Sequence, residues 1–167
     1  MYLIFVSSLN ENMKLANSIK LQMEESNQES VIINLVDLEL PMYDSRKEER
    51  DGIPKKIDEL VELMKKADGY IFVAPEYNYS LPPVLSNFVA WVSRTGKDFR
   101  EVFQMKKIQL ATHSGSGGSD LMNAMRTQFT RLGAMVMPRE IITNFNKPLK
   151  VESSEKILKQ FIAQTEL

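Results

Sequence analysis

Five short apolar runs alternate along the chain with segments of helical period, and this alternation limits the fold more than any other feature. Val and Ile are frequent in the runs, and most runs are continuous rather than interrupted by polar residues. Continuous apolar runs are typical of strands that are buried on both faces, as in a parallel sheet. The predicted strands cover residues 2–6, 30–35, 69–74, 107–112 and 134–138.

The segments between these runs show the spacing of amphipathic helices. In the clearest case, apolar residues at 57, 60, 61 and 64 form one stripe, and Pro54 is suited to the first turn. Gly133 is expected to end the helix that precedes it, and Ser153 or Ser154 to cap the last helix. The other helical stripes run through residues 15–23, 85–92, 122–132 and 157–162.

Strand and helix in repeated alternation predict an α/β fold with helices on both faces of a parallel sheet. Right-handed crossovers leave few topologies, and a flavodoxin-like three-layer sandwich with a five-stranded sheet of order 2-1-3-4-5 suits the chain length. We expect residues 1–167 to form one domain. The polar stretch 37–52 shows no periodicity and is expected to be an irregular excursion over the sheet edge.

Composition excludes several classes of function. The net charge is −1, so no large electrostatic field favours nucleic acid or an anionic membrane as a partner. The absence of cysteine excludes disulfides and thiol chemistry, and a single histidine argues against a transition-metal site. No apolar run approaches the roughly 20 residues that span a bilayer. Because the N-terminus also lacks the basic region of a signal peptide, we expect a cytoplasmic protein.

Ligands of doubly wound sheets bind beyond the carboxyl ends of the strands, where the strand order reverses. The loops after the first, third and fourth predicted strands all lie at that edge. The first loop, residues 7–13, ends at Met13 and offers four small polar side chains. These groups either bind a phosphate at the start of the following helix or simply cap that helix. They are Ser7, Ser8, Asn10 and Asn12.

The second and third loops are equally unusual in composition. The second is stiff and aromatic, so it forms either a rigid wall for a flat ligand or ordinary packing and a subunit contact. It contains Pro75, Glu76, Tyr77, Asn78 and Tyr79. The third either approaches a ligand with its backbone or is a flexible connector, and Ser119 or Asp120 is expected to cap the next helix. It contains Ser114, Gly115, Ser116, Gly117 and Gly118, and the neighbouring His113 is interpreted as structural.

Residues 75–94, "PEYNYSLPPVLSNFVAWVSR", resemble the signature of NADPH-dependent FMN reductases. The matching positions are Pro75, Glu76, Tyr77, Asn78, Ser80, Pro82, Leu85, Asn87 and Trp91. The Gly-rich loop 114–118, the stretch "RLGAMVMP" (131–138), "NMKLA" (12–16) and "DLELPMYD" are also similar to that family. The resemblance extends from about residue 3 to 138. The family's first loop usually carries an arginine, and residues 7–13 contain none.

This resemblance implies that FMN binds with its phosphate at the first loop and its ring between the second and third loops. It implies two-electron transfer from NADPH or NADH through FMN to flavins, quinones or similar small acceptors, by a homodimer or homotetramer. No side chain is assigned a catalytic role, because hydride transfer is chemistry of the flavin. Backbone N–H groups of residues 76–78 and 114–118 would contact the ring, and Glu76 would hold its loop by accepting backbone hydrogen bonds.

Two other classes of function share the predicted fold. One is a flavodoxin-type electron carrier, although such carriers usually present an acidic docking face and the net charge here is only −1. The other is a flavin-free scaffold or regulatory module, which the arginine-free first loop would permit.

Overall fold

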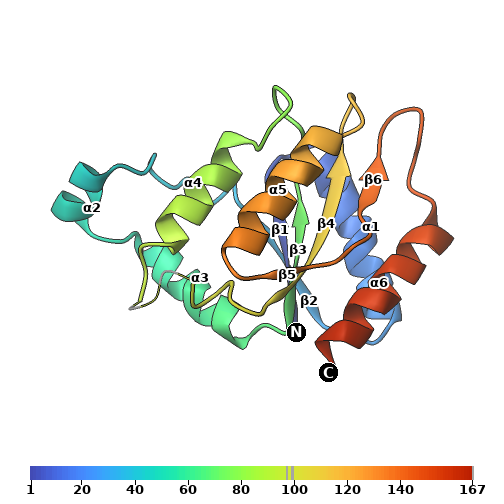
Figure 1. The fold of residues 1–167 in the computed structure, drawn as a ribbon, viewed down its shortest axis with the longest axis horizontal. Coiled ribbons are helices and arrows are strands. Elements are labelled where there is room, and N and C mark those ends of the chain that lie inside the picture. Colours follow the sequence, from blue (N-terminus) through green and yellow to red (C-terminus); the bar gives the residue numbers. More distant parts are fainter. Residues whose placement is uncertain (97, 99, 167) are drawn as a thin grey trace.

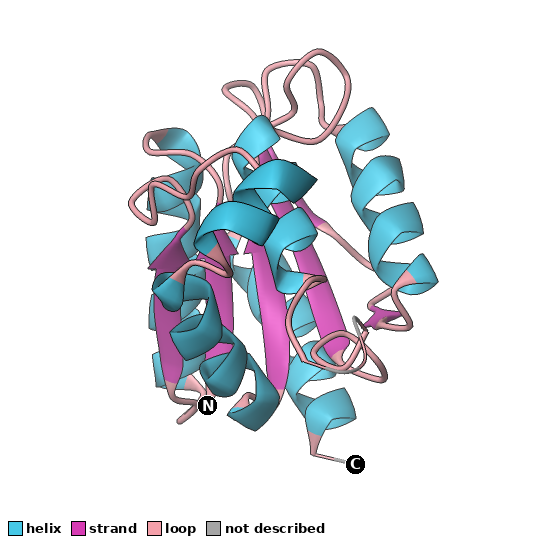
Figure 2. Ribbon diagram, turned by 90° about the vertical axis from the view of Figure 1, so that its left-hand side faces the viewer, coloured by secondary structure: helices cyan, strands magenta, loops and turns pink. Residues whose placement is uncertain are grey.

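A parallel sheet forms the middle layer of the molecule, and helices cover both of its faces (Figures 1 and 2). This computed structural model describes residues 1–96, 98 and 100–166. The strands follow the order β2-β1-β3-β4-β5, which confirms the predicted flavodoxin-like topology, and the short β6 also pairs with β4. The strands are β1 (Tyr2–Val6), β2 (Ser30–Asn34), β3 (Gly69–Val73), β4 (Lys107–His113), β5 (Met135–Val136) and β6 (Ile141–Thr143).

The central strands are buried on both faces, as their continuous apolar sequences predict. Every residue of β1 and of β3 is buried. Leu3 and Phe5 pack on the face covered by α3 (Lys55–Lys66), α4 (Pro83–Val92) and α5 (Ser119–Arg131). Tyr2, Ile4 and Val6 pack on the opposite face, against α1 (Glu11–Glu25) and α6 (Val151–Thr165). Alternate residues of one strand thus stabilise two separate apolar layers.

The helix ends agree only in part with the sequence predictions. Gly133 adopts a φ of 92° just beyond α5, so it ends that helix as expected. The predicted caps of α6 are wrong, because Lys150 occupies the N-cap position and the helix starts at Val151. Ser154 is instead buried within α6 and donates a hydrogen bond to Oε1 of Gln22 at 2.8 Å. This serine therefore joins α6 to α1.

The stretch 37–52 is not fully irregular, since it contains the short helix α2 (Ser45–Asp51). Asp44 caps α2 by accepting from the Lys47 amide at 2.9 Å. The segment before α2 is held by two residues of α4. Trp91 Nε1 donates to the Pro41 carbonyl at 2.7 Å, and Asn87 Oδ1 accepts from the Tyr43 amide at 2.8 Å. Asn87 and Trp91, which both belong to the family-like stretch 75–94, therefore hold the segment before α2 against α4.

The predicted fifth strand, residues 134–138, is shortened to β5, and the unpredicted β6 follows it. Lys107 of β4 pairs with Met135, whereas Ala111 pairs with Ile141, so the register shifts by two residues between β5 and β6. The interruption contains Pro138, which has no N–H to donate to a ladder. At this point the Gln109 side chain donates to the Arg139 carbonyl at 2.7 Å. A side chain thus replaces the missing backbone contact.

Candidate functional site

A cavity of about 600 Å³ opens at the carboxyl ends of β1, β3 and β4, the upper edge of the sheet in Figure 1. It brings together the first and second of the three predicted loops. Of the residues singled out in the sequence, the lining contains Ser7, Ser8, Asn10, Asn12, Pro75 and Tyr77. It also contains Leu9, Glu11, Val36, Pro83, Val84, His113 and Phe145.

The first loop leaves the start of α1 open. Asn10 occupies the N-cap position but its side chain makes no capping hydrogen bond. Within the described residues, the amides of Glu11, Asn12 and Met13 have no acceptor. Unsatisfied N–H groups at the positive end of a helix dipole suit a phosphate. The alternative interpretation, in which this loop simply caps the helix, therefore does not hold for the side chain of Asn10.

The side chains of the first loop have different roles. Ser7 is buried and its hydroxyl lies 3.4 Å from the Val73 carbonyl, so it is used inside the protein. Asn12 is also buried, and its amide group pairs with both backbone groups of His113, at 2.9 Å and 2.8 Å. Met13 packs beside the apolar layer under α1 and lies outside the cavity lining. The Ser8 hydroxyl and the Asn10 side chain line the cavity without a hydrogen-bond partner among the described residues, so both can face a ligand.

The second loop forms a tight two-residue hairpin. Tyr77 and Ser80 exchange backbone hydrogen bonds of 3.1 Å and 3.0 Å around Asn78 and Tyr79, whose φ angles are 49° and 60°. Two successive residues with positive φ define a type I′ turn, in which a tyrosine is strained. Tyr77 lines the cavity and is 48% exposed, whereas Tyr79 is 72% exposed and lies outside the lining.

Glu76 joins the second loop to the third. Its carboxylate accepts from the Leu121 amide at 3.0 Å and from the Ser116 hydroxyl. The expected caps of α5 are wrong, because Gly118 occupies the N-cap position, and neither Ser119 nor Asp120 makes a capping bond. Glu76 therefore supplies from another loop the cap that α5 lacks, which agrees with its expected role as an acceptor of backbone hydrogen bonds.

The third loop lies beside the cavity rather than in its lining. Gly118 needs to be glycine, because its φ is 75° and an added Cβ would lie 2.7 Å from Thr112 Cγ2. Ser114 is buried. The amides of Tyr77, Ser114 and Gly117 all bond to backbone carbonyls, so they are not free for a ligand. Within the described chain, the amides of Glu76, Asn78, Gly115, Ser116 and Gly118 remain without an acceptor.

Two aromatic residues of the cavity lining, His113 and Phe145, were not assigned to the site from the sequence. His113 ends β4, and its ring makes an edge-to-face contact with Phe145 at 4.9 Å between centroids. Phe145 is 79% exposed and follows β6. Because β6 was not predicted, nothing in the sequence placed Phe145 at this edge. The position of His113 at a strand end was the available signal for that residue.

Charge in the site is modest and partly neutralised. Lys14 forms an ion pair with Glu11 at 2.7 Å, and the hydrogen bond from Lys14 lowers the pKa of the half-buried Glu11 carboxyl. In the part of the chain that the structure describes, no group of three or more metal-ligating side chains comes together. Among those same residues, no helix is both long enough and apolar enough to cross a membrane.

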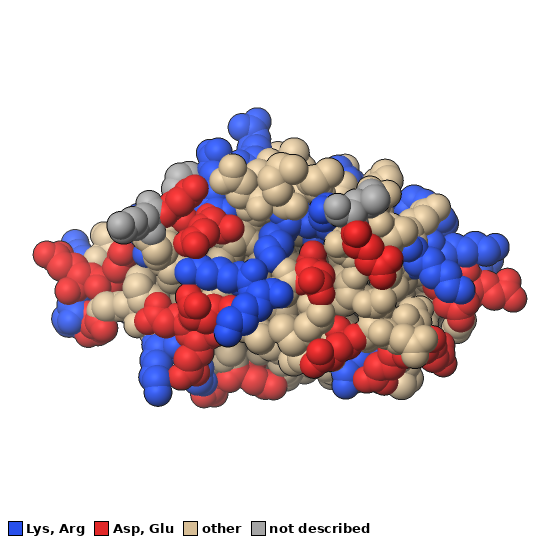
Figure 3. Space-filling view, turned by 90° about the horizontal axis from the view of Figure 1, so that it is seen from below, with Lys and Arg blue, Asp and Glu red and all other residues tan. Residues whose placement is uncertain are grey.

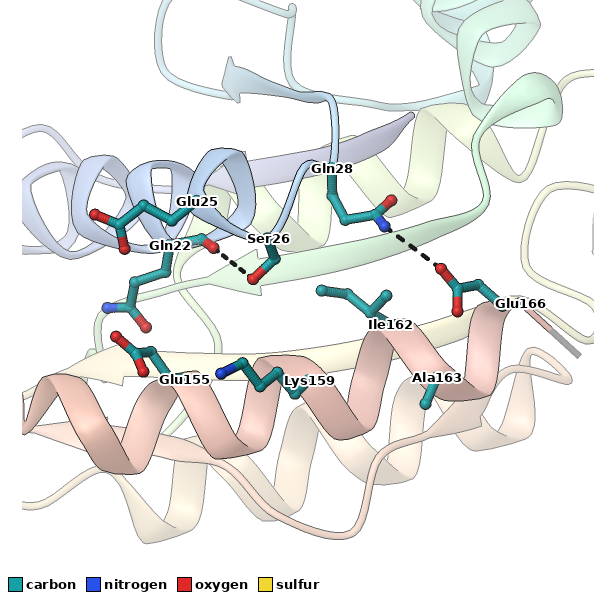
Figure 4. A pocket seen from close by; sticks show the side chains of 9 residues that line it. All are labelled: Gln22, Glu25, Ser26, Gln28, Glu155, Lys159, Ile162, Ala163 and Glu166. Atoms are coloured by element: carbon teal, nitrogen blue, oxygen red, sulfur yellow. Dashed lines mark hydrogen bonds between the residues drawn. The ribbon is translucent and has the colours of Figure 1, made fainter.

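A second cavity, of about 420 Å³, lies between α1 and α6 (Figure 4). Figure 4 shows Glu155 and Lys159 on α6 facing the end of α1, where the Ser26 hydroxyl donates to the Gln22 carbonyl at 2.9 Å. Gln28 closes the far end through a 3.4 Å hydrogen bond to Glu166. This cavity is remote from the carboxyl ends of the strands, so it is not the candidate site.

Comparison with known proteins gives a consistent result. Residues 2–147 match the family model described as NADPH-dependent FMN reductase. The chain is 34% identical over 99 residues to a quinone reductase of Escherichia coli K12, covering 59% of this chain and 52% of that protein. It is 28% identical over 131 residues to a probable NADPH:quinone oxidoreductase 2 of Oryza sativa, covering 77% and 63%. The chain thus spans about half to two thirds of these relatives.

Solved structures agree in fold. A flavoenzyme NAD(P)H:(acceptor) oxidoreductase from Paracoccus denitrificans superposes with a TM-score of 0.75 at 20% identity, covering 98% of this chain and 93% of that one. A flavodoxin from the domain Archaea superposes with a TM-score of 0.69 at 14% identity, covering both chains completely. At these identities the likeness establishes the flavodoxin-like fold.

Proposed function

This chain belongs to the NADPH-dependent FMN reductase family, and from that premise we propose that it binds FMN in the cavity at the carboxyl ends of β1, β3 and β4. We propose that it transfers two electrons from NADPH or NADH, through this FMN, to a small acceptor such as a quinone or a flavin. The curated relatives include a quinone reductase and an NADPH azoreductase, which supports this class of acceptor.

The observation that carries the proposal is the open start of α1 beside a rigid aromatic wall. The unpaired amides of Glu11, Asn12 and Met13 and the hydroxyl of Ser8 suit the FMN phosphate. Pro75 and Tyr77 line the same cavity and would flank the ring. When bound, FMN supplies the hydride-accepting ring, so the protein has only to orient the donor and stabilise charge.

Free backbone amides supply that stabilisation. With Tyr77, Ser114 and Gly117 excluded by their internal hydrogen bonds, the donors for the polar edge of the ring are Glu76, Asn78, Gly115, Ser116 and Gly118. The Glu76 carboxylate is occupied by Leu121 and Ser116, so we assign it to holding the loops and not to proton transfer.

We further propose that the chain works as a single domain in the cytoplasm and as a homodimer or homotetramer. Four exposed apolar residues support a subunit contact near the cavity, because exposed aromatic side chains are typical of interfaces. They are Leu9, Tyr77, Tyr79 and Phe145. Sedimentation of the purified protein tests the oligomeric state.

The proposed function is tested on the purified chain, incubated with FMN and freed of excess ligand. Extracted cofactor is identified by mass, and NADPH oxidation is followed with and without a quinone. We expect FMN rather than FAD, and acceptor-dependent NADPH oxidation at many turnovers. An electron carrier would retain FMN without steady NADPH oxidation, and a scaffold would retain no flavin.

An electron carrier also requires a docking face whose charged side chains are mostly of one sign. Figure 3 shows Lys and Arg mixed with Asp and Glu across the face at the amino ends of the strands. That face lies opposite the proposed FMN site. For docking at the site itself, the net charge of −1 gives little support to an electron carrier.

A further inference from the structure

Phe145 is an aromatic side chain that the fold leaves uncovered at the candidate site. It is 79% exposed, and no large apolar side chain among the described residues is more exposed. Single exposed apolar residues are common on protein surfaces, so exposure alone says little. Phe145 differs because its ring lines the cavity of about 600 Å³ at the carboxyl ends of the strands. A flat ligand in this cavity would cover the ring and gain from its burial.

Hydrogen bonds hold the backbone that carries Phe145. Phe145 and Asn146 form a two-residue turn, around which Asn144 and Lys147 exchange backbone hydrogen bonds of 2.9 and 3.1 Å. The Asn144 side chain also accepts from the amides of Asn146 and Lys147, at 2.9 and 2.8 Å. Thr143, just before the turn, pairs with β4. Because the turn is already ordered, a ligand that packs on Phe145 loses little free energy by fixing it.

The turn stands across the end of β4 from the second loop. β4 pairs with β3 on one side and with β6 on the other. The second loop follows β3 and the turn follows β6, so both rise at the carboxyl edge of the sheet, on either side of β4 (Figure 1). Tyr77 of the second loop and Phe145 line the same cavity. The cavity therefore has an aromatic wall from each side.

Phe145 keeps a ring face free for a ligand. Its ring meets His113 edge to face, with 4.9 Å between the centroids and 78° between the planes. Such a contact occupies at most one face of the Phe145 ring. The Gly-rich third loop, residues 114–118, lies outside the cavity lining. On this side of the cavity, the aromatic surface is thus supplied by Phe145 and His113.

The spacing of the strands matches two stacked rings between the walls. Neighbouring strands are about 4.8 Å apart, which sets the bases of the walls after β3 and β6 about 10 Å apart. Flat groups in van der Waals contact lie about 3.5 Å from one another. Two rings between two walls make three such contacts, which together span about 10.5 Å. The cavity therefore suits a resident ring and a second ring stacked on it.

FMN accounts for one of these rings. Pro75 and Tyr77 would flank one face of the flavin, as proposed above. The other face has to stay open, because hydride transfer requires the donor and the acceptor to meet the flavin at contact distance. The second ring is then that of the incoming molecule, and its outer face is directed towards Phe145.

We propose that Phe145 stacks on the flat ring of the incoming molecule and holds it against the flavin. The site then prefers planar aromatic acceptors, such as quinones, over acceptors without a flat face. The inference rests on the proposed function and adds the residue that selects the acceptor. Loss of one aromatic stacking contact is expected to weaken binding about five- to tenfold.

Binding is measured on the FMN-loaded chain in its oxidised state, which does not react with an oxidised quinone. A naphthoquinone is titrated while the flavin absorption is followed. Phe145→Ala should weaken its binding about five- to tenfold, and Phe145→Tyr, which keeps the ring, less than about twofold. Neither variant should change the affinity for FMN. Leu21→Ala is the control, because Leu21 is 59% exposed on α1 and lies outside the cavity lining, so it should change neither affinity.

Steady-state kinetics at saturating NADPH separates stacking from a general loss of function. With the naphthoquinone as acceptor, Phe145→Ala should raise KM about five- to tenfold at unchanged kcat, the pattern of a lost contact that is equal in the ground and transition states. Ferricyanide is an octahedral ion, and two of these ions accept the electrons of one NADPH. With ferricyanide, KM and kcat should both stay within about twofold of the wild type.

The other outcomes count against the inference. Weaker FMN binding by Phe145→Ala would mean that the side chain covers the flavin and not the acceptor. Equal changes with naphthoquinone and ferricyanide would mean a general effect on the site. Slower sedimentation of Phe145→Ala together with weaker naphthoquinone binding would assign Phe145 to a subunit contact.

Failure of this inference can be told apart from failure of the proposed function. A wild-type chain that binds no FMN would overturn the proposed function, and this inference with it. A chain that binds FMN and oxidises NADPH, but whose naphthoquinone affinity is unchanged in Phe145→Ala, would overturn this inference alone.

Discussion

Tyr79 occupies a conformation that costs free energy, and it does so on the loop that flanks the candidate site. Its φ of 60° is in the left-handed region, and its side chain is 72% exposed, so little packing compensates. Strained residues of this kind persist where surrounding structure determines them, often at functional sites. The type I′ hairpin is fixed by Pro75 on one side and by Pro82 and Pro83 on the other.

Replacing Tyr79 by Gly should therefore raise the free energy of unfolding by about 0.5–1 kcal/mol. Relief of the left-handed strain, about 1–2 kcal/mol, exceeds the entropic cost of glycine, about 0.5–1 kcal/mol. Urea denaturation measures the change. Asn78→Gly is the matched control, with a smaller gain because Asn tolerates positive φ. Destabilisation by Tyr79→Gly would show that the ring makes a compensating contact.

Ser8 is the hydroxyl of the first loop with no internal partner in the described chain, so it is expected to contact the FMN phosphate. Ser8→Ala should weaken FMN by about 1 kcal/mol, the value of one hydrogen bond, and riboflavin by much less. Ser7→Ala is the control, because that hydroxyl bonds to Val73 and should influence folding stability without selectivity between the ligands. Equal losses of FMN and riboflavin affinity in Ser8→Ala would contradict this assignment.

At the scale of elements, Glu76 connects three parts of the site. It lies on the second loop, accepts from the third loop through Ser116, and caps α5 through the Leu121 amide. Glu76→Ala should lower the free energy of unfolding by about 1–2 kcal/mol, as loss of a helix cap does. Glu76→Gln keeps an acceptor for Leu121 and should cost less. Denaturation by urea measures both variants.

Asp120→Ala provides the comparison for Glu76, since Asp120 lies in the first turn of α5 but makes no capping bond. Its effect should stay within about 0.5 kcal/mol, the range of exposed charges near a helix start. If Asp120→Ala were as destabilising as Glu76→Ala, the dipole rather than the cap would explain the stability of α5.

The elements that the sequence predicted are those that bury an apolar stripe or run. β1 and β3 bury every residue, and α3 buries Ile57, Leu60, Val61 and Met64, so periodicity located them. The short helix α2 buries none of its residues, and β6 has only three residues after an interruption at Pro138. Neither leaves a periodic signal. The cap of α5 was missed because it comes from Glu76, far away in the sequence. The N-cap residue of α6, Lys150, makes no side-chain capping bond.

At the scale of the whole molecule, the sheet order explains how much of the site was predictable. Parallel strands place their carboxyl ends at one edge, so three unusual loops could be assigned to one site from the sequence. Which groups of each loop line the cavity depends on contacts between residues that are far apart in the sequence. Examples are the contacts of Asn12 with His113 and of Glu76 with Leu121. These contacts occupy the side chains of Asn12 and Glu76, whereas the pairing of β6 with β4 places Phe145 beside His113 in the cavity lining.

Tyr70 gives the whole molecule a defined response to alkaline pH. Its hydroxyl is buried in the core, and its single hydrogen lies between the carbonyls of Met64 and Val102, whose oxygens are 2.9 and 2.6 Å from the phenol oxygen. Burial raises the pKa of this phenol well above its usual value. Below about pH 10 the phenol is neutral in both the folded and the unfolded chain, so its stabilising contribution is fully present.

Above about pH 10 the unfolded chain loses the Tyr70 proton while the folded chain keeps it. The free energy of unfolding should then fall by up to about 1.4 kcal/mol per pH unit from this residue alone. Tyr70→Phe should lower stability at neutral pH by about 1–2 kcal/mol, through its lost hydrogen bonds, but flatten the alkaline decline. Urea denaturation between pH 8 and pH 11 measures both, with Tyr79→Phe as the control for loss of an exposed phenol. An alkaline slope that is unchanged in Tyr70→Phe would show that the pH response originates elsewhere, for example at Tyr2, whose pKa burial also raises.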